Sequence, residues 1–167
     1  MISRSINKVY WHCSASDFGT NLDISWWHSL RGFASSFRGQ YQVSTGYHFI
    51  ILSRNTSAGE GEELDCLDGS IEVGRRLEQV GAGVKGDNRN SVHICLIGVK
   101  DFSDKQIQSA LRLTMELMVK FGIPVDRVLG HYEWWSRQNL TPKKSCPNID
   151  MDVIRQRLAA MIAKKSS

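Results

Sequence analysis

The stretch from residue 91 to residue 130 constrains the fold most, because the hydrophobic period changes twice within it. Ser91 to Val99 is a short run dense in valine and isoleucine, which indicates a buried strand. From Ser103 to Phe121 the apolar residues recur on one helical face, and Gly122 ends that helix. Val125 to Gly130 then indicates another short strand. Strands and helices that alternate in this way predict an α/β fold, in which a sheet is covered by helices.

The rest of the chain continues this alternation. Further strands are predicted at Lys8–Cys13, Gly46–Ser53 and Gly69–Gly74. Asp23 is expected to cap a helix that ends near Gly32, and a last helix is expected over Asp150–Lys164. Loops are predicted where polar residues or glycines gather, at Gly39–Thr45, Arg54–Glu63, Gly81–Asn90 and Tyr132–Asn148.

Size and composition fit an ordinary globular protein. The chain has 167 residues, 41% of them hydrophobic and 23% charged, and can bury a core without disulfides. Neither an internal repeat nor a linker is visible, so we expect residues 1–167 to form a single domain. The longest apolar runs are too short to cross a bilayer. Because the N-terminus lacks an apolar signal core, we expect synthesis and folding in a cytoplasm.

The net charge is +4, and basic proteins favour anionic partners such as nucleic acid, membrane surfaces or acidic wall polymers. The basic residues are scattered, with only a short cluster at Lys164 and Lys165. A solvated surface accounts for such a distribution. Neither a nucleic-acid partner nor a membrane partner is therefore expected.

The sequence has four cysteines, and none forms a C-x-x-C pair. A zinc ribbon or a thioredoxin-like site is therefore not indicated. A chain of this size in a reducing compartment needs no disulfides. Cys13, Cys66 and Cys95 are expected to be small buried hydrophobic residues.

Three residues of ligand type lie at or beyond predicted strands: His12, His131 and Cys146. Two imidazoles and one thiolate form a three-ligand zinc set that leaves the fourth position open for water. Spacing alone leaves the ordinary alternative open, since a single histidine is more often a surface or core residue. His28, on the first helix, and His93, within a strand, are expected to be structural.

Two other features have ordinary explanations. Residues Gly81 to Gly86 match G-x-G-x-x-G, but a polar run and then a strand follow, whereas a dinucleotide site needs a helix there. Of the tryptophans, Trp26 or Trp27 is expected to pack in the core. Trp134 and Trp135 follow His131, where contact with a sugar or peptide is the alternative to packing.

Five short motifs follow one another along the chain: His12–Ser16, Gly46–Ile51, Gly86–Ser91 with Cys95–Gly98, Gly130–Glu133 and Lys144–Asp150. In this order they resemble the motifs of the type-2 N-acetylmuramoyl-L-alanine amidases. These are the small bacteriophage amidase lysozymes, which are related to the peptidoglycan recognition proteins. The set is specific, although each motif alone is not.

The resemblance implies a central mixed β-sheet flanked by helices, with one catalytic zinc ion in a surface cleft. It implies that His12, His131 and Cys146 bind the zinc and that Tyr47 and Lys144 are catalytic residues beside it. The implied reaction is hydrolysis of the amide bond between N-acetylmuramic acid and L-alanine in peptidoglycan. The protein is then expected to be a phage or prophage endolysin, made in the host cytoplasm and active on the cell wall after release.

Elementary chemistry agrees with these roles. Lys144 is two residues before Cys146, so an extended segment puts both side chains on one face. An ammonium group there can stabilise the oxyanion that forms when an amide is attacked. The hydroxyl of Tyr47 can orient the attacking water or assist the leaving amine.

The sequence departs from the family in two places. Many members have a histidine where this chain has Gly83, so no substrate contact is expected from that position. The segment between His131 and Cys146 is longer than in the small phage enzymes and is expected to reshape the cleft wall.

Two other functions compete with the lytic one. Non-catalytic peptidoglycan receptors of the superfamily commonly lose the cysteine ligand, whereas Cys146 is present here. Cytosolic amidases that recycle muropeptides typically use aspartate as the third ligand, so the cysteine favours the phage branch. Some phage amidases also bind RNA polymerase, and nothing in the sequence tests that partner.

Overall fold

The computed structural model describes residues 4–33, 36–38, 41–57 and 64–165. Its strands are β1 (Lys8–Cys13), β2 (Ser36–Arg38), β3 (Tyr41–Val43), β4 (Phe49–Ile51), β5 (Ile71–Val73), β6 (Ser91–Leu96) and β7 (Val128–Gly130). Its helices are α1 (Asn21–Ser29), α2 (Asp104–Phe121), α3 (Glu133–Arg137) and α4 (Met151–Lys165), with the 3-10 turn η1 (Val125–Arg127) before β7.

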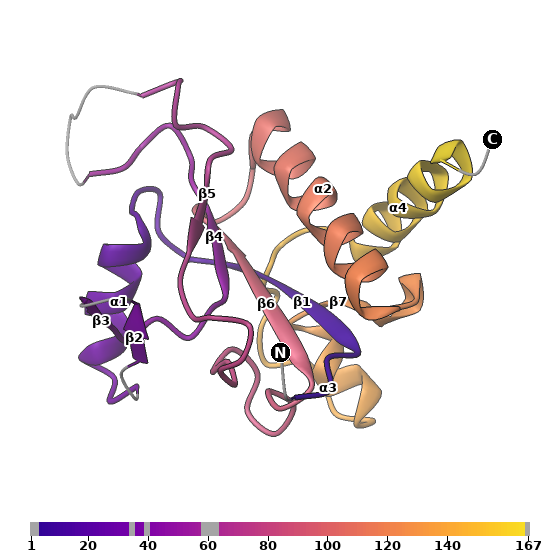
Figure 1. The fold of residues 1–167 in the computed structure, drawn as a ribbon, viewed down its shortest axis with the longest axis horizontal. Helices are drawn as coiled ribbons and strands as arrows, with labels where there is room; N and C mark the ends of the chain where they lie inside the picture. The colour runs from indigo at the N-terminus through magenta and orange to yellow at the C-terminus, as the bar shows by residue number, and fades with distance from the viewer. Residues whose placement is uncertain (1–3, 34–35, 39–40, 58–63, 166–167) are drawn as a thin grey trace.

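Within the described residues, five strands form one sheet in the order β5-β4-β6-β1-β7. Strands β4, β6, β1 and β7 run parallel, and β5 pairs antiparallel with β4. A separate antiparallel hairpin joins β2 to β3. The sheet is therefore mixed, as expected. Strand β1 lies next to β6 and β7, which are both distant from it in the sequence (Figure 1).

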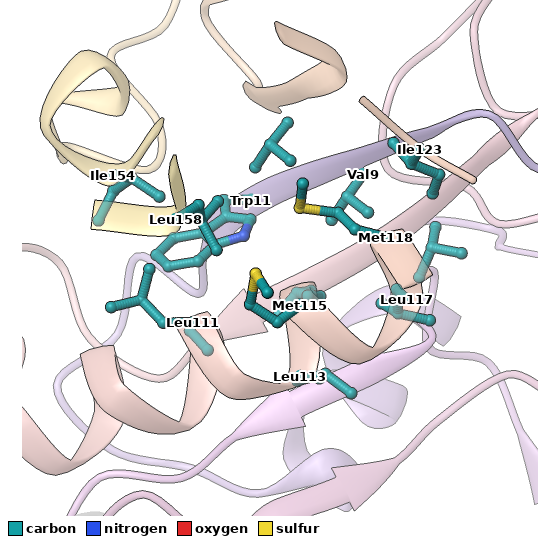
Figure 2. Packing of buried hydrophobic residues seen from close by; sticks show 14 of the residues in the cluster. Val9, Trp11, Leu111, Leu113, Met115, Leu117, Met118, Ile123, Ile154 and Leu158 are labelled. Atoms are coloured by element: carbon teal, nitrogen blue, oxygen red, sulfur yellow. The ribbon is translucent and has the colours of Figure 1, made fainter. Parts of the chain in front are cut away.

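Helices α2 and α4 cover one face of this sheet (Figure 1). Trp11 of β1 is fully buried between them, and its indole N–H donates a hydrogen bond to the Thr114 hydroxyl at 3.0 Å. Figure 2 shows Trp11 among side chains of both helices, including Leu111, Met115 and Leu158. This apolar layer fixes β1, the strand that carries His12.

Helix α1 covers the opposite face. Its Ile24 packs in a second buried cluster with residues of the central strands, including Ile50 and Cys95. Successive side chains of a strand point to opposite faces. His12 alternates with Trp11 and therefore lies on the α1 face, where Cys95 is its neighbour in register.

Capping residues mark the ends of helices α2 and α1. Ser103 caps α2 through a capping box with Gln106, and Gly122 ends the helix in the left-handed region at φ 65°. Helix α1 begins earlier than expected. Thr20 is its N-cap, and Asp23 is the N3 partner that bonds back to Thr20. The prediction of Asp23 as the cap was therefore wrong by one turn.

Some local predictions were wrong. Residues 41–43 of the predicted loop Gly39–Thr45 form β3, and α3 lies inside the predicted loop Tyr132–Asn148. Residues 39–40 and the 58–63 part of the predicted loop Arg54–Glu63 lie outside the described residues. Three-residue strands and one-turn helices carry too few residues to show a period, so their sequences give little local signal. Among the described residues, no helix combines the length and apolar character needed to span a membrane.

Candidate metal centre

The end of the sheet at which β1 and β7 terminate brings two histidines together. His12 is the penultimate residue of β1, and His131 directly follows β7. The backbone N–H of His131 donates to the carbonyl of Trp11 at 3.2 Å, which continues the β1–β7 pairing to the histidine itself. The two imidazole centroids lie 4.9 Å apart.

Cys146 reaches the same place from the loop before α4. The backbone N–H of Tyr132 donates to the Cys146 carbonyl at 2.9 Å, and the backbone N–H of Cys13 donates to its sulfur at 3.3 Å. The ligand atoms of His12, His131 and Cys146 all lie within 4.8 Å of one another. The structure thus assembles the three residues that the sequence singled out.

The donor set and its spacing fit zinc. Sγ of Cys146 lies 4.0 Å from Nδ1 of His12. Zinc bonds to sulfur and nitrogen are about 2.3 Å and 2.0–2.1 Å, so two atoms at this separation can share one ion. The geometry identifies Nδ1 as the nitrogen of His12 that faces the cluster.

Burial keeps both imidazoles neutral, which metal ligation requires. Loss of solvation lowers the pKa of His12 far below its usual range. Burial also lowers the pKa of His131 to about 4, and the positive charge of Lys144 adds to this effect. Neither ring needs to lose a proton at neutral pH before it can bind a cation.

The thiols of Cys13 and Cys146 interact. Their hydrogen bond lowers the pKa of Cys13 to about 7 and raises that of Cys146. A cation in the cluster would favour the thiolate on Cys146 instead, because Cys146 and not Cys13 groups with the two imidazoles. Cys13 is buried as expected, but it also supports the cluster through its backbone N–H.

Tyr47 lies beside His12, with ring centroids 4.9 Å apart. Burial raises the pKa of Tyr47 well above its usual value, so its hydroxyl stays protonated. His28 holds the backbone that leads into Tyr47. Its Nδ1 accepts the backbone N–H of Gly46 at 2.9 Å, and its ring stacks on Phe33. His28 is therefore structural, as expected, and its place explains how Tyr47 is held.

Lys144 is exposed, yet its charge acts on both histidines of the cluster. Burial is the main cause of the lowered pKa of His131, and the charge of Lys144 is the second. The same charge also helps to lower the pKa of His12. Lys144 is exposed and Cys146 is partly exposed, so solvent reaches both side chains. A surface cleft around the cluster stays a prediction.

Glu133 joins the cluster to the last helix. Its carboxylate accepts the backbone N–H of Gly130 at 2.8 Å and pairs with the guanidinium of Arg155 at 2.9 Å and 3.1 Å. The side chains of this pair are 17% and 18% exposed. Sequence reasoning assigned no role to Glu133. Its position two residues after His131 was the available signal.

We expect Glu133→Gln to lower the free energy of unfolding by about 2 kcal/mol, between the values for an exposed and a buried ion pair. The matched control is Asp152→Asn, because Asp152 pairs with the same Arg155 but is 80% exposed. Its effect should stay below about 0.5 kcal/mol. Urea unfolding of both variants measures the difference, and equal losses would show that Glu133 does not anchor this region.

The predicted packing and burial of the remaining tryptophan and cysteine residues are confirmed for some of them and wrong for one. Trp135 stacks on His131 at 5.1 Å, and Trp134 packs with a small cluster that includes Tyr10. Cys95 is fully buried, which confirms its structural role. Cys66 is exposed in the turn before β5, so its predicted burial was wrong. Cys66 lies in the exposed first part of this turn, beside Asp65, which is also exposed.

Comparison with known families identifies the chain as an amide-bond hydrolase. The family model described as N-acetylmuramoyl-L-alanine amidase matches residues 3–149, so the chain belongs to this family. The resemblance of its five motifs is confirmed. The activity is hydrolysis of the amide bond between N-acetylmuramic acid and L-alanine in peptidoglycan.

Individual relatives agree. The chain is 30% identical over 158 residues to the endolysin of Escherichia phage T7, across 88% of this chain and 83% of that protein. It is similar to the solved amidase LysC of Clostridium intestinale URNW, with a TM-score of 0.69, 22% identity and coverage of 95% and 89%. Drosophila PGRP-LB matches with a TM-score of 0.58, 21% identity and coverage of 87% and 76%. These two structures show the shared fold.

Proposed function

We propose that this amidase is zinc-dependent, with one ion held by His12, His131 and Cys146, and that residues 1–167 form its catalytic domain. The observation that supports this most directly is the convergence of three ligand atoms within 4.8 Å at the end of the sheet where β1 and β7 terminate. Both histidines are neutral for the reason given above, and a nearby cation stabilises the thiolate. A zinc ion with three protein ligands supplies an electrophile for a carbonyl oxygen and acidifies water.

Tyr47 and Lys144 carry the remaining catalytic work in this proposal. The hydroxyl of Tyr47 stays protonated and lies beside His12, so it can donate a hydrogen bond to the reacting amide. The ammonium of Lys144 is exposed and its charge acts on both histidines, so it can stabilise the negative charge that develops on the carbonyl oxygen of the substrate. Trp135, stacked on His131, is placed to contact the sugar or peptide beside that bond.

We further propose that the protein is a phage or prophage endolysin, made in the host cytoplasm and active on the wall after release. The similarity to the endolysin of phage T7 over most of both chains supports this. The cysteine in the cluster supports it over a recycling enzyme with an aspartate ligand. It also supports an enzyme over a receptor without the cysteine.

The expected result with purified peptidoglycan sacculi is rapid clearing, with new stem-peptide amino groups and no new reducing sugar ends. Removal of zinc with a chelator should abolish clearing, and added zinc should restore it. The parallel substrate is a soluble anhydro-muropeptide with the same amide bond. Turbidity and product analysis on both substrates measure the outcome.

Efficient cleavage of the soluble fragment with negligible action on sacculi would replace the endolysin proposal with muropeptide recycling. New reducing ends would contradict amide cleavage altogether. Full activity of protein that metal analysis shows to be free of zinc would contradict the metal proposal and leave the lytic one standing.

A further inference from the structure

His93 is a buried imidazole that the proposed mechanism does not use. It lies within β6, is fully buried, and stacks between the rings of Tyr10 and His48 at 5.8 Å and 5.7 Å. Its Nε2 has no hydrogen-bond partner among the described residues. An unpaired buried nitrogen is unfavourable, and an apolar side chain would fill the same space without it. A reason for a histidine at this position must therefore come from its other ring nitrogen, Nδ1.

That nitrogen, Nδ1 of His93, lies 3.0 Å from Nε2 of His12. His12 directs its Nδ1 at Cys146, so Nε2 is the nitrogen on the far side of the ring. A neutral imidazole carries its proton on one nitrogen only. If His12 carries it on Nε2 and donates it to His93, the lone pair of Nδ1 faces the cluster. If the proton moves to Nδ1, that lone pair is lost.

We propose that His93 is a positioning residue that holds His12 in the orientation and tautomer that bind zinc, by accepting the Nε2–H of His12 on its own Nδ1. The inference rests on the proposed metal site. Ligating histidines generally donate their second N–H to an acceptor, commonly a carboxylate, a carbonyl or water. Here a second histidine takes that part, and its own proton then lies on Nε2, which has no acceptor among the described residues.

The backbone around His93 is built to hold this arrangement. Nδ1 of His48 accepts the backbone N–H of His93 at 3.0 Å. A Cβ atom at Gly83 would lie 2.6 Å from Nδ1 of His93 and 2.8 Å from Nε2 of His12. A Cβ at Gly81 would collide with Cδ2 of His93. Gly81 and Gly83, two of the three glycines that resemble a nucleotide fingerprint, are thus required by the close approach of this loop to the imidazole pair.

The residue at position 83 and the residue at position 93 compete for the same volume. Because a Cβ at Gly83 meets both hydrogen-bonded nitrogens, a side chain there and the imidazole of His93 exclude each other. The glycine noted as a departure from the family is therefore the condition for a histidine at position 93.

The test compares His93→Leu, which removes the acceptor, with His93→Asn, whose side-chain oxygen can replace Nδ1. Zinc affinity is measured by competition with a chromophoric chelator, and the ligand field by the absorption spectrum of the cobalt-substituted protein. We expect His93→Leu to bind zinc about 10- to 100-fold more weakly and to shift the cobalt spectrum, as loss of a partner of a ligand does. His93→Asn should recover most of both. Tyr10→Phe, which keeps the ring that stacks on His93 and removes only the hydroxyl bonded to Asp87, is the control and should leave both unchanged.

Wild-type zinc affinity and an unchanged cobalt spectrum in His93→Leu would overturn the proposal. Equal losses in His93→Leu and His93→Asn would also overturn it, because they would show a packing effect only. If His93→Leu does not fold, His93→Met takes its place, since the flexible methionine fills irregular space. Absence of zinc binding in the wild-type protein is a different outcome and would contradict the metal site itself.

Discussion

Cys146→Ser is expected to lose nearly all zinc at sub-micromolar concentrations of the ion and, with it, the amidase activity. An alcohol is not deprotonated at neutral pH, whereas a coordinated thiol is, so the variant offers the ion two neutral imidazoles only. Apparent zinc binding of about 10–16 kcal/mol over four ligands gives roughly 2.5–4 kcal/mol for one, or an affinity loss of about 60- to 700-fold. Metal analysis after dialysis and chelator competition measure the loss.

Cys66→Ser is the matched control, because Cys66 is an exposed cysteine outside the cluster. It should keep full zinc content and full activity. Unfolding of metal-free Cys146→Ser should resemble that of the metal-free wild type, which separates ligand loss from misfolding. Full metal occupancy in Cys146→Ser would contradict its assignment as a ligand.

Tyr47→Phe and Lys144→Ala are expected to keep their zinc and their fold but to lose catalysis. Each variant removes one donor that acts on the charge developing in the substrate, and such a loss typically lowers the rate by about 100- to 1,000-fold. The effect should fall mainly on kcat, because the interaction is made in the transition state. Turnover of sacculi together with zinc content measures it.

Lys143→Ala is the control for Lys144→Ala, since Lys143 is also exposed and adjacent but its charge is not among the causes of the lowered pKa of His131. It should retain near wild-type turnover. Near wild-type turnover in Lys144→Ala or Tyr47→Phe would show that the residue does not have the proposed role. Loss of zinc in either variant would assign its effect to the metal instead.

The parts of the fold that could be predicted are those with a long local pattern. The bounds of β1 were predicted in full, and those of α2 within one residue, because alternation and capping are properties of neighbouring residues. The hairpin of β2 and β3 and the short helix α3 were missed. Three to five residues complete no hydrophobic period, and pairing partners decide such segments.

For the candidate site, the ligand residues were predicted but the residue that supports them was not. The grouping of His12, His131 and Cys146 followed from the motif order, whereas their spacing alone left it open. The partner of His12 was not predicted, because it depends on the register that places Tyr10 beside His93 across β1 and β6. Registers between strands 80 residues apart leave no local mark in a sequence. The exposed Cys66 shows the same limit, since residue type alone does not fix burial.

Strand β1 is translated early, but both of its neighbours in the sheet are translated late. Its register pairs Val9 with Val92 on one side and with Val128 on the other, and Cys146 emerges from the ribosome after both. A nascent chain therefore holds the first histidine on a strand without partners for most of its synthesis. With the metal site proposed here, a chain that ends before residue 146 lacks one of the three ligands. We therefore expect translation that is interrupted before this residue to yield no wall-degrading fragment.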